Sequence, residues 1–317
     1  MHPADALAAI SGFDRFQQGR MRPVDKLAPI RSFDRFQQAH RVLAVSVAVQ
    51  KKVSDDSAGN YAALIAYYGF LSMFPLLLLA VAILGFIVHS NASAEHTILN
   101  SGLPNIPIIG TTLKHGHLSG SGLAVAVGAV GALWSGLAIT NTLENTFNQI
   151  NDVPRADRPG FLAGRLRGVG LLFGAGILEL VAITLTGLVS AGVGGLALDI
   201  GGFALSLVLN GALFAFVFRM LSAERLTNRE LWPGVVFATI GWELIQAIGG
   251  IYVHHVLNKA SATYGTFASV IGLLAWLYLG ARVVVYAAEL NSVLAQGRWP
   301  RSLLAAAEPA PPGEQQG

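Results

Sequence analysis

A few polar and ionisable residues interrupt long apolar stretches of this 317-residue chain, and they are the side chains best placed to do chemistry. Within a bilayer each charge costs at least about 2.5 to 3.5 kcal/mol, so it must find a partner, water or a ligand. We therefore take these residues as the candidate polar interior of the protein. They are Glu179, Asn210, Glu243, Gln246, Arg282, Tyr286 and Glu289.

Arg282 is the only cation of this set, and its partner decides what the set does. Tyr286 and Glu289 follow it four and seven residues later, on the same face of a helix. The simplest arrangement pairs Arg282 with Glu243 or Glu289 inside a helix bundle. Such a pair is either a buried ionic clamp that fixes helix register or part of a pathway for a substrate or proton. Neither alternative allows these residues to face lipid.

A second polar set follows one of the apolar stretches. It consists of Asn141, Glu144, Asn145 and Asn148, which share one helical face, while Phe147 lies on the opposite face. The pattern predicts an amphipathic helical extension that ends before Pro154. Its polar face is either the wall of a cytoplasmic vestibule or a plain solvated surface.

Several chemistries are excluded or disfavoured by composition. The chain has no cysteine, and so has no thiolate nucleophile, disulfide or cysteine metal site. His115 and His117 form a His-x-His pair, but no carboxylate at ligand spacing completes a metal site. We expect no catalytic residue, no metal and no cofactor, and so no enzyme.

The elements that position these residues are membrane spans. Hydrophobic residues make up 53% of the chain and charged residues only 12%, against about a quarter charged in soluble domains. About 20 apolar residues form a helix that crosses a bilayer. The sequence predicts an all-α, polytopic membrane protein with six spans, at about 67–88, 121–139, 166–189, 200–218, 233–253 and 265–286.

The Lys and Arg residues give these spans an orientation. Nineteen of the 21 fall in alternate segments that include both chain ends, and only Lys114 and Lys259 fall in the others. Because positively charged loops stay in the cytoplasm, both termini are expected there, in a multi-pass plasma (inner) membrane protein. The basic residues thus report topology and contact with the inner leaflet, without a nucleic-acid partner.

The chain divides into three expected regions. Residues 1–60 form a basic cytoplasmic segment in which 3–20 and 23–40 are a tandem repeat, identical at 11 of 18 positions. Its residues 33–52 suggest a helix lying on anionic lipid. Residues 61–296 form the membrane domain, and the Pro- and Gln-containing tail, 297–317, is expected to be disordered.

Four separated motifs resemble the BrkB/YihY family of inner-membrane proteins. They are AALIAYYGFLSMFPLLLL (62–79), WSGLAITNTLENTFNQINDVP (134–154), WELIQAIGGIYV (242–253) and SATYGTFASVIGLLAWLYLGARVVVYAAELNSVL (261–294). The resemblance covers roughly 31–296. It implies six membrane helices and a poorly defined activity, with a virulence factor linked to serum resistance among the members. Some members carry an old ribonuclease BN label, and the family offers no agreed catalytic site to carry over.

Three functions follow, in decreasing order of support. The first is a transporter-like or envelope-associated protein that handles a lipid, amphiphile or ion through its polar interior. The alternative is a non-catalytic scaffold whose basic N-terminal arm binds anionic lipid or a partner. The third, a ribonuclease, lacks a compact His/Asp cluster beside basic phosphate contacts.

Overall fold

The computed structural model describes residues 36–37, 39–90, 122–190, 196–222, 226–252, 266–297 and 299, and every regular element in these ranges is helical. The elements are α3 (Arg41–Asp55), α4 (Ala58–Ser90), α7 (Gly122–Ile150), the 3-10 helix η2 (Arg155–Asp157), α8 (Phe161–Ser190), α9 (Leu196–Leu221), α10 (Asn228–Tyr252) and α12 (Thr266–Ala295). Among the described residues, six helices are long and apolar enough to cross a membrane. The predicted all-α polytopic fold is confirmed.

The chain separates into two compact units. One holds residues 52–297, and the other holds 1–51 together with 298–317. Helix α3 falls in the segment where the sequence predicts an interfacial helix. The tandem repeat at 3–20 and 23–40, nearly all of the histidine-containing loop 89–119 and nearly all of the tail 297–317 lie outside the described residues.

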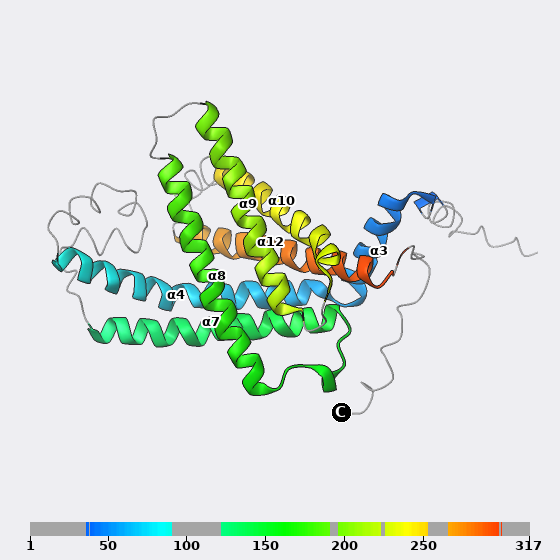
Figure 1. The fold of residues 1–317 in the computed structure, drawn as a ribbon. Coiled ribbons are helices and arrows are strands. Elements are labelled where there is room, and N and C mark those ends of the chain that lie inside the picture. The colour runs from blue at the N-terminus through cyan, green and yellow to red at the C-terminus, as the bar shows by residue number, and fades with distance from the viewer. Residues whose placement is uncertain are drawn as a thin grey trace, which may run out of the picture. The chain divides into compact units, whose positions relative to one another are not determined.

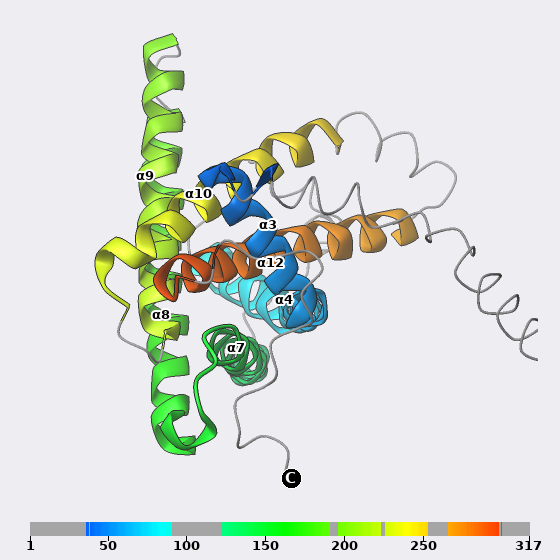
Figure 2. The ribbon, with the colours of Figure 1, turned by 90° about the vertical axis from the view of Figure 1, so that its right-hand side faces the viewer.

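The six long helices of the 52–297 unit form a ring. Each packs chiefly against two neighbours, in the order α4, α7, α8, α9, α10, α12 and back to α4. Figures 1 and 2 show α4 beside α7, with the pair formed by α8 and α9 running steeply across them. Helices that are neighbours in the ring are also consecutive in the chain, except α12 and α4. Their contact closes the ring and joins segments that are far apart in the sequence.

Two glycines allow the closest helix contacts in this ring. A Cβ atom at Gly128 of α7 would lie 2.9 Å from the backbone of Leu79 in α4. A Cβ atom at Gly234 of α10 would lie 2.5 Å from the carbonyl oxygen of Ala287 in α12. Backbone atoms cannot move aside as a flexible side chain can, so only glycine fits these two crossings.

Helix α7 ends in a turn that sets the start of α8. Asp152 adopts a left-handed conformation with φ of 52°, and the Val153 amide donates to the carbonyl oxygen of Asn148 at 2.9 Å. This is the six-to-one hydrogen bond of a Schellman-type helix end. The predicted extension of the helix to a point before Pro154 is confirmed, and η2 then leads directly into α8.

Candidate functional site

A cavity of about 700 Å³ lies inside the ring and is lined by residues from all six long helices. Its walls are mostly apolar, with Leu277 of α12 and Phe214 of α9 as examples. Two tryptophans, Trp242 and Trp276, also line it and pack against each other with ring centroids 5.3 Å apart. A cavity of this size and character suits the apolar part of a ligand.

One side of this cavity is polar. Glu243 is not among the lining residues, but it accepts hydrogen bonds from two residues that are. The Ser206 hydroxyl donates to Glu243 Oε1 at 2.8 Å, and Asn210 Nδ2 donates to the same oxygen at 2.9 Å. Ser206 and Asn210 both line the cavity, as do Glu179 of α8 and Gln246 of α10. Four of the predicted interior residues are therefore gathered on three consecutive helices of the ring.

Helical spacing explains this wall. Ser206 and Asn210 are four residues apart on α9, and Asn210 Nδ2 lies 3.2 Å from Ser206 Oγ. Residues at this spacing lie one above the other on the same face. Glu243 and Gln246, three residues apart, do the same on α10. The two faces meet because α9 and α10 are neighbours in the ring.

Arg282 has a different environment from the one predicted. Its Nη2 atom donates to the Tyr286 hydroxyl at 2.8 Å, and its guanidinium lies over the rings of Tyr286 and Tyr278, at 5.2 and 5.9 Å from their centroids. Within the described ranges Arg282 makes no ion pair with Glu243, Glu289 or any other carboxylate. The predicted pairing is wrong because the arginine is stabilised by aromatic faces instead.

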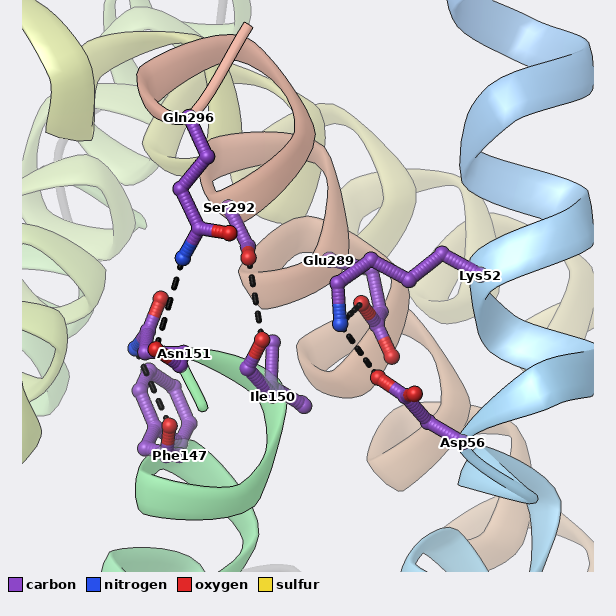
Figure 3. A network of polar contacts seen from close by, with 8 residues as sticks. All are labelled: Lys52, Asp56, Phe147, Ile150, Asn151, Glu289, Ser292 and Gln296. Atoms are coloured by element: carbon purple, nitrogen blue, oxygen red, sulfur yellow. Dashed lines mark hydrogen bonds and ion pairs between the residues drawn. The ribbon is translucent and has the colours of Figure 1, made fainter. Parts of the chain in front are cut away.

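Glu289 pairs with Lys52, which the sequence did not indicate as its partner. Lys52 Nζ lies 3.2 Å from Glu289 Oε2 and also contacts the carboxylate of Asp56. The side chains of Lys52 and Glu289 are 1% and 0% exposed. Figure 3 shows the lysine between the two carboxylates. The structure therefore contains a buried ion pair at Glu289, but its cation is Lys52 and not the predicted Arg282.

The same end of α12 also holds the end of α7. The Ser292 hydroxyl donates to the carbonyl oxygen of Ile150 at 2.9 Å, and Gln296 Nε2 donates to that of Asn151 at 3.3 Å (Figure 3). Carbonyl groups in the last turn of a helix have no partner within the helix. Polar side chains of α12 thus satisfy the end of α7 and fix its position.

A second pocket, of about 250 Å³, lies between the end of α7 and the start of α8. All four predicted vestibule residues line it, namely Asn141, Glu144, Asn145 and Asn148. The facing wall includes Arg158, Gly160 and Arg165. Along this face Asn141 and Asn145 are exposed, Glu144 is half-buried, and Asn148 is only 2% exposed.

Two residues of these sites, Ser206 and Lys52, were not predicted from the sequence, and only the first has a local sequence signal. The four-residue spacing of Ser206 and Asn210 is visible in the sequence, and it marks Ser206 as a neighbour of Asn210. Lys52 and Glu289 are separated by most of the chain, and no local pattern links them. Among the described residues, no group of three or more His, Cys, Asp and Glu side chains forms a metal site.

Comparison with known proteins identifies relatives over most of the chain. Residues 49–311 match the profile of the family described as "Virulence factor BrkB". The ribonuclease-like protein YfkH of Bacillus subtilis is 27% identical, over 73% of this chain and 87% of its own length. The inner membrane protein YhjD of Escherichia coli is 27% identical, over 78% of this chain and 80% of its own.

A third relative extends the same pattern. A UPF0761 membrane protein of Alteromonas mediterranea is 24% identical, over 78% of this chain and 86% of its own length. No solved structure matches the chain. These relatives agree with the six apolar helices in indicating a multi-pass membrane protein.

Proposed function

The chain belongs to the virulence factor BrkB family of membrane proteins, and we propose that it binds an amphiphile inside its helix ring and moves it within the membrane. The observation that carries the proposal is that Glu243 accepts hydrogen bonds from Ser206 and Asn210, two polar residues that line a mostly apolar cavity. An apolar space with a few convergent polar groups is the usual form of a small-molecule site. The apolar wall suits the ligand's tail, and the polar wall suits its head.

The chemistry of the head follows from the polar wall. Both hydrogen bonds to Glu243 end on Oε1, and Oε2 accepts none from the described residues. Glu179 lines the cavity and adds a second carboxylate on this polar side. Carboxylates accept hydrogen bonds and attract cations. The best ligand is therefore an amphiphile whose head donates hydrogen bonds, such as a primary ammonium.

Lipid movement in proteoliposomes tests this function. The probe is phosphatidylethanolamine with a nitrobenzoxadiazole fluorophore on its acyl chain, and dithionite quenching reports how fast it changes leaflet. Glu243→Gln should lower the rate about tenfold or more, because a charged acceptor becomes neutral. Glu230→Gln is the matched control on the same helix, away from the cavity. Equal rates for Glu243→Gln, wild type and protein-free liposomes would contradict the proposal.

The variant Arg282→Ala distinguishes this proposal from one in which all residues of the candidate polar interior form a pathway. Unlike Glu243, Arg282 makes no hydrogen bond to a described residue that lines the cavity. Its contacts are with Tyr278 and Tyr286, which lie outside the lining. Its replacement should lower stability while the folded fraction still moves the probe. Loss of movement from fully folded Arg282→Ala would instead place the arginine on the path.

We also propose that both termini face the cytoplasm, as the distribution of Lys and Arg favours. The absence of native cysteine makes the test direct, because a single introduced cysteine is then the only thiol. Ala156→Cys, in η2, should resist a membrane-impermeant maleimide added to intact cells, and Ser101→Cys should react. The reverse labelling would overturn the orientation.

A nuclease assay on the same purified samples addresses the name of the Bacillus subtilis relative, which is ribonuclease-like. RNA cleavage that is lost in Glu144→Gln and Asp152→Asn but kept in Glu243→Gln would favour a ribonuclease over an amphiphile carrier. We expect no cleavage above a mock purification.

A further inference from the structure

The pocket between α7 and α8 has one wall of hydrogen-bond acceptors without partners. Asn148 is 2% exposed, and its Oδ1 atom has no hydrogen-bond partner in the described part of the chain. Glu144 Oε1 is likewise buried and without a partner there. Buried polar atoms in folded proteins are nearly always paired. Two unpaired acceptors in one pocket therefore point to a ligand that donates hydrogen bonds.

The opposite wall of the pocket provides hydrogen-bond donors and positive charge. Pro159, Gly160 and Phe161 line the pocket where α8 begins. The first amide groups of a helix have no partner within it and carry the positive end of its dipole, so they attract anions. Arg165 lines the same wall, with its guanidinium 5.3 Å from the centroid of the Phe161 ring. This wall suits a phosphate group.

Arg158 strengthens this wall and is held in place. Its Nε atom donates to the carbonyl oxygen of Val153 at 3.0 Å, and an Nη atom lies 3.5 Å from Gln149 Oε1. These bonds to the turn after α7 orient the guanidinium and leave other donors free. A fixed arginine beside a helix start is a common arrangement for a phosphate.

The position and size of the pocket identify the ligand further. The candidate membrane span of α8 begins at Phe161, whose side chain is 81% exposed. The end of a span lies at the level of lipid headgroups. A space of about 250 Å³ is far larger than the ~30 Å³ share of one water molecule. It accommodates a group that has a cation at one end and a phosphate at the other.

We propose that this pocket binds a phosphoethanolamine group, with its ammonium toward Glu144 and Asn148 and its phosphate toward the start of α8 and Arg165. The ammonium supplies the donors that the α7 wall lacks, and the phosphate accepts from the α8 wall. The source is either the headgroup of phosphatidylethanolamine or a soluble phosphoethanolamine. The pocket shares no lining residue with the large cavity, so the site is independent of the proposed transport function.

Native mass spectrometry of the full-length protein in detergent tests this site. Dioleoyl phosphatidylethanolamine should bind about tenfold more tightly than dioleoyl phosphatidylcholine, whose trimethylammonium has no hydrogen to donate. It should also bind more tightly than dioleoyl phosphatidylglycerol, which lacks the cation. Glu144→Gln should abolish most of this preference, because it removes the charge that faces the ammonium. Arg165→Gln should weaken the binding of all three lipids, because they share the phosphate. Arg155→Gln is the matched control, since it removes the same charge from a residue outside the pocket.

Competition with soluble phosphoethanolamine distinguishes the two sources. Displacement of the lipid shows that the isolated group is recognised, and its failure shows that the ligand is the intact lipid; either result supports the site. Gly164→Ala provides a variant that leaves every charge in place. Its Cβ would lie 3.3 Å from Glu144 Oε2, so it should weaken binding by crowding the carboxylate.

The outcome that overturns the site is equal binding of the three lipids, an ethanolamine preference that survives in folded Glu144→Gln and Gly164→Ala, or lipid binding that is unchanged in folded Arg165→Gln. Glu243→Gln should leave this preference unchanged while it lowers transport. Failure of this site and failure of the proposed function are therefore distinguishable.

Discussion

A glutamate near the end of α12 and a glutamate in the middle of α10 both lie among helices, but their surroundings differ. Glu289 is 0% exposed and paired with Lys52, and its neighbours Ser292 and Gln296 bond the end of α7 (Figure 3). Glu243 adjoins a large cavity, and only one of its two oxygens is bonded within the described residues. The first arrangement is closed and holds helices in register. The second is incomplete and leaves room for a ligand.

Loss of the lysine should break the closed region most severely. Lys52→Met leaves Glu289 buried without its cation, and removal of one partner of a buried pair typically costs about 3 to 5 kcal/mol. We expect a large drop in the midpoint of thermal unfolding of the purified protein in detergent.

Two further variants check the cause of this drop. Lys51→Met changes the adjacent, less buried lysine and should have a much smaller effect. The double variant Lys52→Met/Glu289→Leu removes both charges and should recover part of the loss, since an apolar pair is often as stable as a buried ion pair. A wild-type midpoint for Lys52→Met would show that the pair does not hold this end of the bundle.

The crossing of α10 and α12 extends the closed region and gives the next largest effect. The Gly234 amide donates to Asn291 Oδ1 at 2.7 Å, and a Cβ atom there would meet Asn291 and the Ala287 carbonyl. Gly234→Ala should therefore cost about 1 to 3 kcal/mol through overpacking, measured by the same thermal unfolding. In Gly176→Ala, where nothing lies within 4 Å of the new Cβ, the midpoint should stay level or rise. Equal behaviour of the two variants would refute the close crossing.

The open region should respond weakly in stability. Glu243→Gln keeps an oxygen that accepts from Ser206 and Asn210, so the free energy of unfolding should change by less than about 1.5 kcal/mol. The same variant should lose lipid movement, and this separation of stability from activity is what distinguishes Glu243 from Glu289. A loss of stability as large as that of Lys52→Met would place Glu243 in the closed, structural class.

The membrane helices were predictable because their signal is local. Each long apolar run is a property of its own residues, and the six predicted spans correspond to α4, α7, α8, α9, α10 and α12. The helices extend beyond the spans, since helical hydrogen bonds do not stop where apolar residues stop. The end of α7 before Pro154 was predictable from the proline. The grouping of Asn141, Glu144, Asn145 and Asn148 was predictable from helical spacing.

The partners of the buried charges were not predictable in the same way. The energetic cost of a charge within a membrane indicates that it is shielded, and Glu289 is buried while Arg282 and Glu243 are half-buried. This cost alone does not choose between partners. Lys52 was counted among the basic residues that orient the chain, because it precedes the first span. Lys52 lies in the last turn of α3, just before α4 begins. Its pairing with Glu289 therefore requires α4 to pack against α12, which is distant in the sequence.

The turn between α7 and α8 gives the smallest expected effect. Asp152 has φ of 52°, a left-handed conformation that costs most residues about 1 to 2 kcal/mol and glycine almost nothing. Asp152→Gly should therefore raise the free energy of unfolding by no more than about 1 kcal/mol, because glycine also has more freedom in the unfolded chain. Asp152→Val should lower it, because a β-branched residue is strained there. If valine and glycine gave the same thermal midpoint, the turn would not constrain α8, and the pocket beside it would lack the fixed wall that its proposed ligand requires.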